Sequence, residues 1–339
     1  MHSIETRAPR PVAARPQVLV LMATFNGGPW VAEQVRSIIA QRDVEVTLVV
    51  RDDASEDDTL AQIEACFDPT ERPRTLRASK PGGSASRNFF RLILEADASG
   101  FDYVALADQD DVWESGKLAR AVSQLAGKDA VGYSAAVRAF WPDGRSAILR
   151  QSRRFTSADY LFEGGGQGCT YVLRASAYGE LRAQLSELRE HLDALHYHDW
   201  TLYALCRVGG FEWFIDDWVC LRYRQHAGND TGARAGLAAL AKRLALVRSG
   251  WYGAQIDAIA RLCVAAGGDG AAVAERYLRY SRASSARPAG RFRLGLFAFF
   301  SGRRRLADRV VVAWAGLSGW LDPARQDPPA ARGSSEPEQ

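Results

Sequence analysis

YVALADQDD, residues 103–111, places three carboxylates within four positions, directly after an apolar run. The run predicts a buried strand, so the acids come at its carboxyl end, the edge of an open α/β sheet where ligands bind. Carboxylates this close repel one another, and a cation between them relieves the repulsion. Because the donors are oxygens, the sequence predicts a hard divalent ion such as Mg²⁺ or Mn²⁺. The competing interpretation is a solvated loop that caps a helix beginning near Trp113.

Strand and helix patterns alternate before this stretch. Apolar strands are expected over 17–24 and 44–50, with a shorter one near 74–77, and each is followed by a helical pattern. Such alternation predicts an α/β fold with a doubly wound, mostly parallel sheet. The later elements are expected to be a hairpin around 141–144 and two strands over 211–215 and 218–224.

The chain of 339 residues is 47% hydrophobic and contains nine Trp, enough for a substantial core. Its five Cys are dispersed without a CxxC pair, which indicates buried thiols and a reducing compartment. The N-terminus lacks the apolar segment of a signal peptide, and no apolar stretch reaches the ~20 residues that a bilayer requires. The expected division is a disordered leader over 1–16, an α/β domain over 17–231, a basic helical region over 232–321 and a disordered tail over 322–339.

The net charge of +3 conceals a basic segment. Residues 231–310 contain 15 Lys and Arg against 4 Asp and Glu, a local charge of +11 that leaves −8 for the rest of the chain. With its interleaved Trp, Phe and Leu, this segment predicts contact with an anionic membrane surface or a diphosphate-bearing acceptor. The alternative is a compositional bias, because only four Lys accompany 39 Arg in the chain.

A second acidic cluster, DDASEDDT at residues 52–59, follows the strand expected over 44–50. It comes at the same edge of the sheet as 108–111, so the two clusters should share a crevice. An Asp here can accept the imide N–H of uracil or thymine. Ser55 and Asp58 are candidate N-caps of the next helix, but capping does not account for five acids in eight positions.

HYHDW at residues 196–200 is a third candidate site. Asp199 stands at the start of a helical pattern and is either its N-cap or a general base. Losing a cap costs ~1 kcal/mol of stability, whereas losing a general base costs ~10²–10⁴ in rate. His196 and His198 with Asp199 form only a weak zinc pattern, because no Cys pair supports it. A further histidine, His226 after the last expected strand, is by itself more often structural.

Taken together, these segments resemble the inverting family 2 glycosyltransferases, particularly their rhamnosyltransferase-like branch. They occur in the family's order and cover about residues 17–231, whereas the helical region beyond is less diagnostic. The resemblance implies a Rossmann-like GT-A fold with a mostly parallel central sheet and a C-terminal helical extension. The matching segments are MATFNG at 22–27, DDxSxDxT at 52–59, DQDDxW at 108–113, QGCT at 167–170, HDW at 198–200 and YRQH at 223–226.

The resemblance also implies roles for individual residues. Asp199 matches the family's general base, although many relatives carry an acid where this chain has His198. Asp110 and His226 are expected to hold the metal, Mn²⁺ or Mg²⁺. The nucleotide is expected to contact Thr24, Asn26, Asp52, Asp53, Asp108 and Asp110, and the acceptor to contact Gly168, Cys169, Thr170, His198 and Trp200.

The expected reaction is transfer of one sugar, rhamnose by resemblance, from a dTDP- or UDP-linked donor to a glycan or lipid-linked acceptor. Displacement leaves negative charge on the nucleoside diphosphate, and a divalent ion neutralises this charge. The leaving group then needs no proton from the protein, so a single carboxylate, acting as base on the acceptor hydroxyl, suffices for inversion. Glycosidases need a second acid for a poorer leaving group. Nucleic acid is not an expected partner. The expected location is cytoplasmic, peripheral at the inner face of the cytoplasmic membrane.

Two alternatives stay open. A sugar-1-phosphate nucleotidyltransferase would also join an α/β sheet to carboxylate-bound Mg²⁺. It needs a cationic Gly-rich loop after the first strand, however, and FNGGPW at 25–30 contains no Lys or Arg. The other alternative is a non-catalytic nucleotide-sugar or glycan-binding protein with the same fold, which a donor hydrolysis assay with Mn²⁺ separates from an enzyme.

Overall fold

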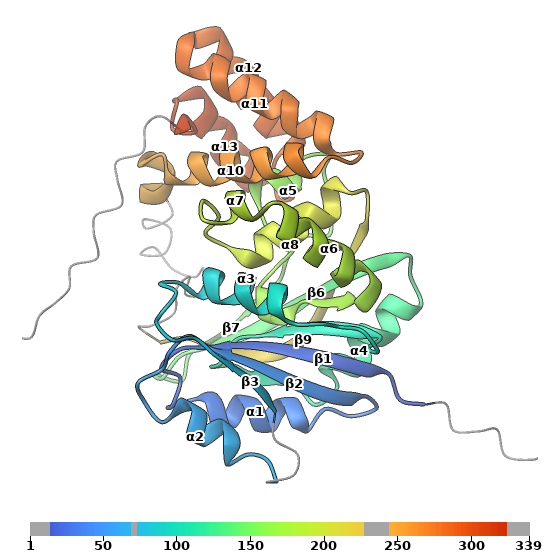
Figure 1. The fold of residues 1–339 in the computed structure, drawn as a ribbon. Coiled ribbons are helices and arrows are strands. Elements are labelled where there is room, and N and C mark those ends of the chain that lie inside the picture. Colours follow the sequence, from blue (N-terminus) through green and yellow to red (C-terminus); the bar gives the residue numbers. More distant parts are fainter. Residues whose placement is uncertain (1–13, 69–72, 227–243, 324–339) are drawn as a thin grey trace, which may run out of the picture.

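The computed structural model describes residues 14–68, 73–226 and 244–323. Its centre is one sheet with helices on both faces (Figure 1). The strand order among the described residues is β3-β2-β1-β4-β8-β6-β9-β5, with β7 paired to β6. The leader and the tail expected at the two ends of the chain lie almost wholly outside the described residues.

The first part of the sheet is parallel, which confirms the prediction from the alternating pattern. Strand β1 (Gln17–Thr24) pairs in parallel with β2 (Glu45–Asp52) and with β4 (Tyr103–Ala107). Strand β3 (Arg74–Arg77) extends the sheet beside β2. The connecting helices are α1 (Val31–Ile39), α2 (Thr59–Glu64) and α3 (Ala85–Glu95).

Strand β1 is buried on both faces, which explains its continuous apolar sequence. Val20 and Met22 point into the core beneath α1 and α4 (Lys117–Ala126). Leu19 and Leu21 point into the opposite core, which α3 covers. Full burial of such a side chain contributes about 1.5–3 kcal/mol relative to leaving it exposed.

The second part of the sheet is mixed. Strand β8 (Val172–Arg174) runs antiparallel to β4, and β6 (Ala130–Phe140) runs antiparallel to β8. The hairpin expected around 141–144 is confirmed, because β7 (Ser146–Leu149) returns antiparallel to β6. The β6–β7 pair is thus a local hairpin, whereas β8 pairs with strands that are distant from it in the sequence.

The two strands expected over 211–215 and 218–224 are a single strand, β9 (Glu212–Arg224), parallel to β6. The residues that resemble a turn form a bulge, at which the register to β6 shifts between Ala135 and Ala136. The Asp216 carboxylate accepts a hydrogen bond from the Trp218 N–H at 3.1 Å. The Asp216 side chain therefore pairs with one backbone N–H of the bulge within a continuous strand.

The helix expected near Trp113 also begins elsewhere. Val112 and Trp113 form strand β5, which pairs antiparallel with Arg222 and Leu221 of β9. Helix α4 then begins at Lys117. A partner strand more than a hundred residues away thus determines the conformation of these two residues, and no local pattern indicates it.

Residues 244–323 are largely helical, as expected, and contain α10 (Trp251–Ala266), α11 (Ala271–Ala286), α12 (Pro288–Ser301) and α13 (Leu306–Leu317). Figure 1 shows them gathered at the end of the molecule opposite α1 and α2. Their buried residues, such as Ile256 and Phe297, belong to the same apolar core as Leu19 of β1. Across the described ranges, no helix combines the length and apolar character needed to cross a membrane.

Candidate active site

The carboxyl ends of β1, β2 and β4 meet at one edge of the sheet. Thr24 at the end of β1 pairs with Asp52 of β2, and Met22 pairs with Ala107 of β4. The acidic cluster at 52–59 and the cluster at 108–111 therefore follow β2 and β4, the two strands that flank β1, at the same edge of the sheet.

Asp52 is a structural centre of this edge. Its side chain is buried and accepts hydrogen bonds from the Thr24 hydroxyl at 3.0 Å and from the Ser55 hydroxyl at 2.5 Å. The Ser55 hydroxyl in turn accepts the Asn26 N–H at 2.8 Å. Asn26 has a φ of 47°, in the left-handed region that Asn tolerates better than most residues. Three of the residues expected at the nucleotide thus stabilise the first turn.

Asp53 lies next to Asp52 with a different environment. Its carboxylate is 3.4 Å from Nη1 of Arg51 and accepts the Gly82 N–H at 2.6 Å. Arg51 also donates to the Asn88 amide oxygen at 2.8 Å, and the Asn88 amide donates to the Thr24 carbonyl at 3.1 Å. Helix α3, which carries Asn88, is therefore tied across the carboxyl ends of β1 and β2.

Asp57 caps helix α2 in place of the expected Ser55 and Asp58. Asp58 occupies the N-cap position but makes no side-chain cap bond. Asp57 accepts hydrogen bonds from the Thr59 N–H at 3.0 Å and from the Gly28 N–H at 3.0 Å. Burial acts to raise the pKa of Asp57, but these hydrogen bonds outweigh it and lower the pKa below its ordinary value.

The loop after β4 is held by its own side chains. Gln109 makes two hydrogen bonds to the backbone of Phe25, with the Phe25 N–H at 2.8 Å and with its carbonyl at 3.0 Å. Asp110 lies 2.8 Å from Nε2 of His226, whose ring stacks on Trp30 with centroids 3.9 Å apart. The Arg224 side chain donates to the Asp110 carbonyl at 2.9 Å. The end of β9 thus closes over the acidic loop.

Asp111 is the acid of this loop that sequence reasoning left out of the site. Its side chain is buried (0% exposed), and its Oδ2 atom has no hydrogen-bond partner among the described residues. Burial, reinforced by the charges of Asp110 and Asp108, raises its pKa well above the ordinary value. Only its place as the third acid in the cluster pointed to it.

Donor atoms of Asp108, Asp111 and Cys169 lie within 4.8 Å of one another. Burial raises the pKa of the Cys169 thiol well above its ordinary value, and the charges of the two carboxylates add to the effect. The thiol therefore keeps its proton, which leaves the oxygens of Asp108 and Asp111 as the donors available to a cation. Mutually repelling acids and a hydrogen-bond acceptor without a partner suit a hard cation. The expected metal ligands Asp110 and His226 are not part of this cluster. They lie next to it, because Asp110 stands between Asp108 and Asp111 in the same loop.

Asp199 lies in the first turn of α8 (His198–Val208), where its Oδ1 atom accepts the Trp200 N–H at 2.7 Å. The N-cap position of this helix belongs to Tyr197, so Asp199 is not its N-cap residue, although its carboxylate does accept a backbone N–H of the first turn. A Cβ on Gly168 would lie 3.0 Å from the Cβ of Asp199 and 2.8 Å from Nε2 of His198. Asp199 is therefore packed against the loop that carries Cys169.

His198 stacks on Phe89 of α3, with ring centroids 3.8 Å apart. Its Nε2 atom is buried without a hydrogen-bond partner among the described residues. Burial lowers the pKa of His198 to about 3, so the ring is neutral near pH 7. Because Phe89 follows Asn88, this contact links Asp199 to the edge that holds Asp53.

The remaining residues expected at the acceptor are buried. Thr170 and Cys169 lie in the short helix η1 (Gly168–Thr170), and the Thr170 hydroxyl donates to the Gln167 carbonyl at 2.7 Å. Trp200 points into the core, where its indole N–H donates to the Tyr160 carbonyl at 2.7 Å. Its large apolar ring is thus used for packing, and the structure does not support an acceptor contact for it.

Lys117 lies beneath the acidic loop and is not among the site residues expected from the sequence. Its ammonium is 3.0 Å from the centroid of the Trp113 ring, and it has no hydrogen-bond partner among the described residues. Burial lowers its pKa to about 8, an effect that the nearby Cys220, Cys169 and Asp111 oppose. It supplies positive charge below carboxylates that would otherwise repel one another.

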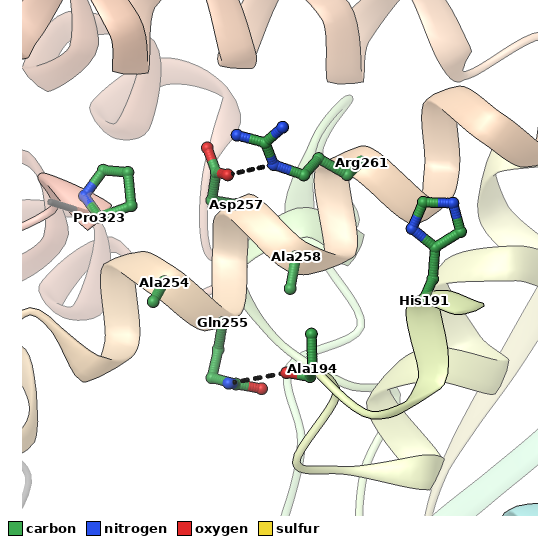
Figure 2. A pocket seen from close by; sticks show the side chains of 8 residues that line it. All are labelled: His191, Ala194, Ala254, Gln255, Asp257, Ala258, Arg261 and Pro323. Atoms are coloured by element: carbon green, nitrogen blue, oxygen red, sulfur yellow. Dashed lines mark hydrogen bonds and ion pairs between the residues drawn. The ribbon is translucent and has the colours of Figure 1, made fainter. Parts of the chain in front are cut away.

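A cavity of about 350 Å³ lies elsewhere, between α10 and the segment around α7 (Arg189–Leu192). Figure 2 shows His191, Gln255, Asp257 and Arg261 around it, with Asp257 and Arg261 paired to each other. It contains none of the acids of the sheet edge, so it is separate from the candidate active site.

Residues 19–173 match the family described as Glycosyl transferase family 2. The dTDP-rhamnosyl transferase RfbG of Shigella flexneri is 36% identical over 240 residues, which cover 70% of this chain and 83% of RfbG. The chain belongs to glycosyl transferase family 2. A second relative matches a shorter region: the succinoglycan biosynthesis protein ExoO of Rhizobium meliloti is 30% identical over 123 residues, which cover 36% of this chain and 32% of ExoO.

The solved structure of S. aureus TarS 1-349 in complex with UDP-GlcNAc is similar with a TM-score of 0.56 and 15% identity, over 91% of this chain and 89% of TarS 1-349. The TarS complex with UDP gives a TM-score of 0.53. This likeness confirms the expected GT-A fold. Family membership makes the protein a glycosyltransferase of the hexosyltransferase class, in preference to a nucleotidyltransferase or a non-catalytic binding protein.

Proposed function

We propose that this family 2 glycosyltransferase transfers a sugar, with inversion, from a nucleoside diphosphate to a hydroxyl of a glycan or lipid-linked acceptor. The first donor to test is dTDP-rhamnose, because the Shigella relative is named for it. The observation that carries the proposal is the position of the adjacent residues Gly168 and Cys169. Gly168 packs against Asp199, whereas Cys169 lies with Asp108 and Asp111. The proposed base and the proposed donor site are thereby neighbours.

The nucleotide base is assigned to Asp53. A carboxylate offers about four acceptor sites, and the bonds to Arg51 and Gly82 use only part of them. Those two contacts fix the direction of the carboxylate, so that it can accept the imide N–H of thymine or uracil. Asp52 and Asn26 act indirectly in this proposal, because they hold the turn on which the base would lie.

Asp199 is assigned as the general base. The acceptor hydroxyl has a pKa far above 7, so a carboxylate must accept its proton as the bond to the sugar forms. His198 is neutral near pH 7, so it supplies no charge to this carboxylate. Since a nucleoside diphosphate leaves without protonation by a protein acid, the displacement requires only one carboxylate for proton transfer, and that carboxylate is assigned to Asp199.

A divalent ion, Mn²⁺ or Mg²⁺, is assigned to the acids of the loop, Asp108, Asp110 and Asp111, with His226 beside them. When bound, such an ion neutralises charge on the diphosphate leaving group. The loop residues orient these carboxylates, through the bonds of Gln109 to Phe25. The proposed location is cytoplasmic, at the inner face of the membrane, where a lipid-linked acceptor would be presented.

The decisive experiment compares Asp199→Asn with Asp193→Asn, a matched change at an exposed side chain nearby. Transfer from dTDP-rhamnose is measured beside a panel of other nucleotide sugars, with and without Mn²⁺. Asp199→Asn is expected to lower kcat by ~10²–10⁴ while donor binding is unchanged. A loss of less than about tenfold in a stable Asp199→Asn protein would remove Asp199 from the mechanism.

A further inference from the structure

The outward face of α12 carries a stripe of large apolar side chains. Phe292, Leu296 and Phe300 are 57%, 42% and 69% exposed. They recur at every fourth position, which places them on one face of a helix. Soluble proteins seldom leave a continuous apolar surface uncovered, so this stripe indicates a binding partner.

Helix α13 carries a second stripe of the same kind. Leu306, Val310 and Trp314 also recur at every fourth position, and they are 64%, 54% and 59% exposed. Val311 lies beside them and is 49% exposed. Two successive helices therefore present large apolar residues to solvent.

Both stripes lie on the same side of the α12–α13 hairpin. The helices are joined by residues 302–305 and meet at two glycines, since a Cβ on Gly316 would be 3.1 Å from the Cα of Gly295. A connection of four residues makes the two helices an antiparallel hairpin. In each helix the stripe lies roughly a quarter-turn beyond the glycine contact at about 100° per residue. The offset has the same sense around each helix axis when each helix is followed from its N-terminus. Because the two axes point in opposite directions, these offsets place both stripes on the same side of the hairpin.

Arginines surround this apolar surface. Residues 287–317 contain seven Arg and one acid, Asp308, which gives the hairpin a charge of +6. Arg287, Arg291, Arg293 and Arg305 are exposed. An apolar face bordered by arginines matches a helix that lies in the interface of an anionic bilayer. A second copy of the hairpin would instead bring two surfaces of the same charge together.

The turn of the hairpin is attached to the loop that precedes the proposed acceptor residues. The Arg304 guanidinium donates to the Gly164 carbonyl at 2.7 Å and lies 3.0 Å from Asp159. Arg303 lies 3.1 Å from Glu163. The hairpin and the loop leading to Gly168 are therefore held in a fixed relation.

We propose that the α12–α13 hairpin binds an anionic lipid surface, with both apolar stripes at the boundary between headgroups and acyl chains. The proposal rests on the proposed function in one respect, because the membrane would present the lipid-linked acceptor to the loop that the hairpin holds.

Co-sedimentation of the full chain with vesicles tests this binding. Vesicles of phosphatidylcholine and phosphatidylglycerol are expected to bind the protein, and vesicles of phosphatidylcholine alone to bind it at least about tenfold more weakly. Phe300→Ser with Trp314→Ser is expected to weaken binding to the anionic vesicles by about tenfold or more. Arg287→Glu with Arg293→Glu should weaken it by a similar factor and reduce its dependence on salt. Ile39→Ser, at an exposed apolar residue of α1, is the matched control and should bind as the wild type does.

Equal binding to both kinds of vesicle, or wild-type binding by the Phe300→Ser, Trp314→Ser protein, would overturn the proposal. So would a dimer in light scattering that this double variant separates, since a second copy would then be the partner. Donor hydrolysis without vesicles is measured on the same variants and is expected to be unchanged. If vesicle binding holds while transferase activity fails for every donor, the docking surface stands and the proposed reaction is wrong.

Discussion

The carboxylate of Asp110 lies 2.8 Å from Nε2 of His226, although 116 positions separate the two residues. The first stands in the loop after β4 and the second directly follows β9, so their contact joins the two halves of the sheet. Trp30 stacks on the other side of the contact, against the His226 ring. The proposed metal site therefore brings together an acid after β4, a histidine after β9 and an aromatic residue beside α1.

Asp110→Asn is expected to abolish metal-dependent donor binding, because it removes a negative charge at the cluster and keeps the side-chain shape. His226→Gln should weaken that binding less, since it leaves all three carboxylates of the loop in place. Titration calorimetry with donor and Mn²⁺ measures both effects. Asp143→Asn, in the exposed turn between β6 and β7, is the control. Unchanged heats for Asp110→Asn would exclude Asp110 from the metal site.

Gly168→Ala is expected to lower kcat by about a hundredfold with little change in donor affinity, because small displacements of a catalytic group carry large penalties. The added Cβ would meet Nε2 of His198 at 2.8 Å and displace Asp199. Gly116→Ala is the matched control, since nothing lies within 4 Å of its added Cβ. Similar kinetics in the two variants would contradict the placement of Asp199 against this loop.

His198 predicts a specific pH dependence of stability. The folded pKa is about 3, whereas an unfolded histidine titrates near about 6.5. The unfolded state thus binds more protons between these values, so the free energy of unfolding falls as pH drops from about 6.5 towards 3. Urea denaturation of His198→Gln should show a shallower fall in this window. The variant also loses the stacking on Phe89, which lowers its stability at every pH, including pH 8. The test is therefore the slope of the free energy of unfolding against pH, and not its absolute value.

Arg304 is fully buried, with 0% of its side chain exposed, and it pairs with the equally buried Asp159. Arg304→Met is expected to lower the free energy of unfolding by about 3–5 kcal/mol, because it leaves Asp159 in the core with less compensation. Arg207 also contacts Asp159, at 3.1 Å, so the loss should lie at the lower end of this range. Arg279→Met, at an exposed position on α11, should change stability by less than about 0.5 kcal/mol. Equal denaturation midpoints for the two variants would contradict this role.

The parallel part of the fold could be predicted because its signals are local. Apolar runs such as 17–24 end in turn residues, and the acids at 52–53 and 108–111 stand directly after their strands. Parallel pairing then brings these ends together without further information. The prediction of a shared edge needed only the order of the elements.

The mixed part could not be predicted because its pairing is distant. Asp216 resembles a turn residue, but it accepts hydrogen bonds from Arg120 at 2.7 Å and from the Tyr133 hydroxyl at 3.1 Å, which allow a bulge inside β9. Likewise, a short pattern cannot tell a buried carboxylate from an exposed one. The burial of Asp111 beside Asp108 and the packing of Trp200 in the core therefore do not follow from the sequence pattern.

The core that α10 to α13 share with the sheet has a consequence for protein engineering. Ile256 and Phe297 pack in the same apolar cluster as Leu19, and Arg304 completes the charge balance around Asp159. A chimera that exchanges the C-terminal helices of two family members at a breakpoint near residue 231 would cut through this common interior. Recombinant hybrids will keep their folding cooperativity only when both sides of that interior come from the same parent.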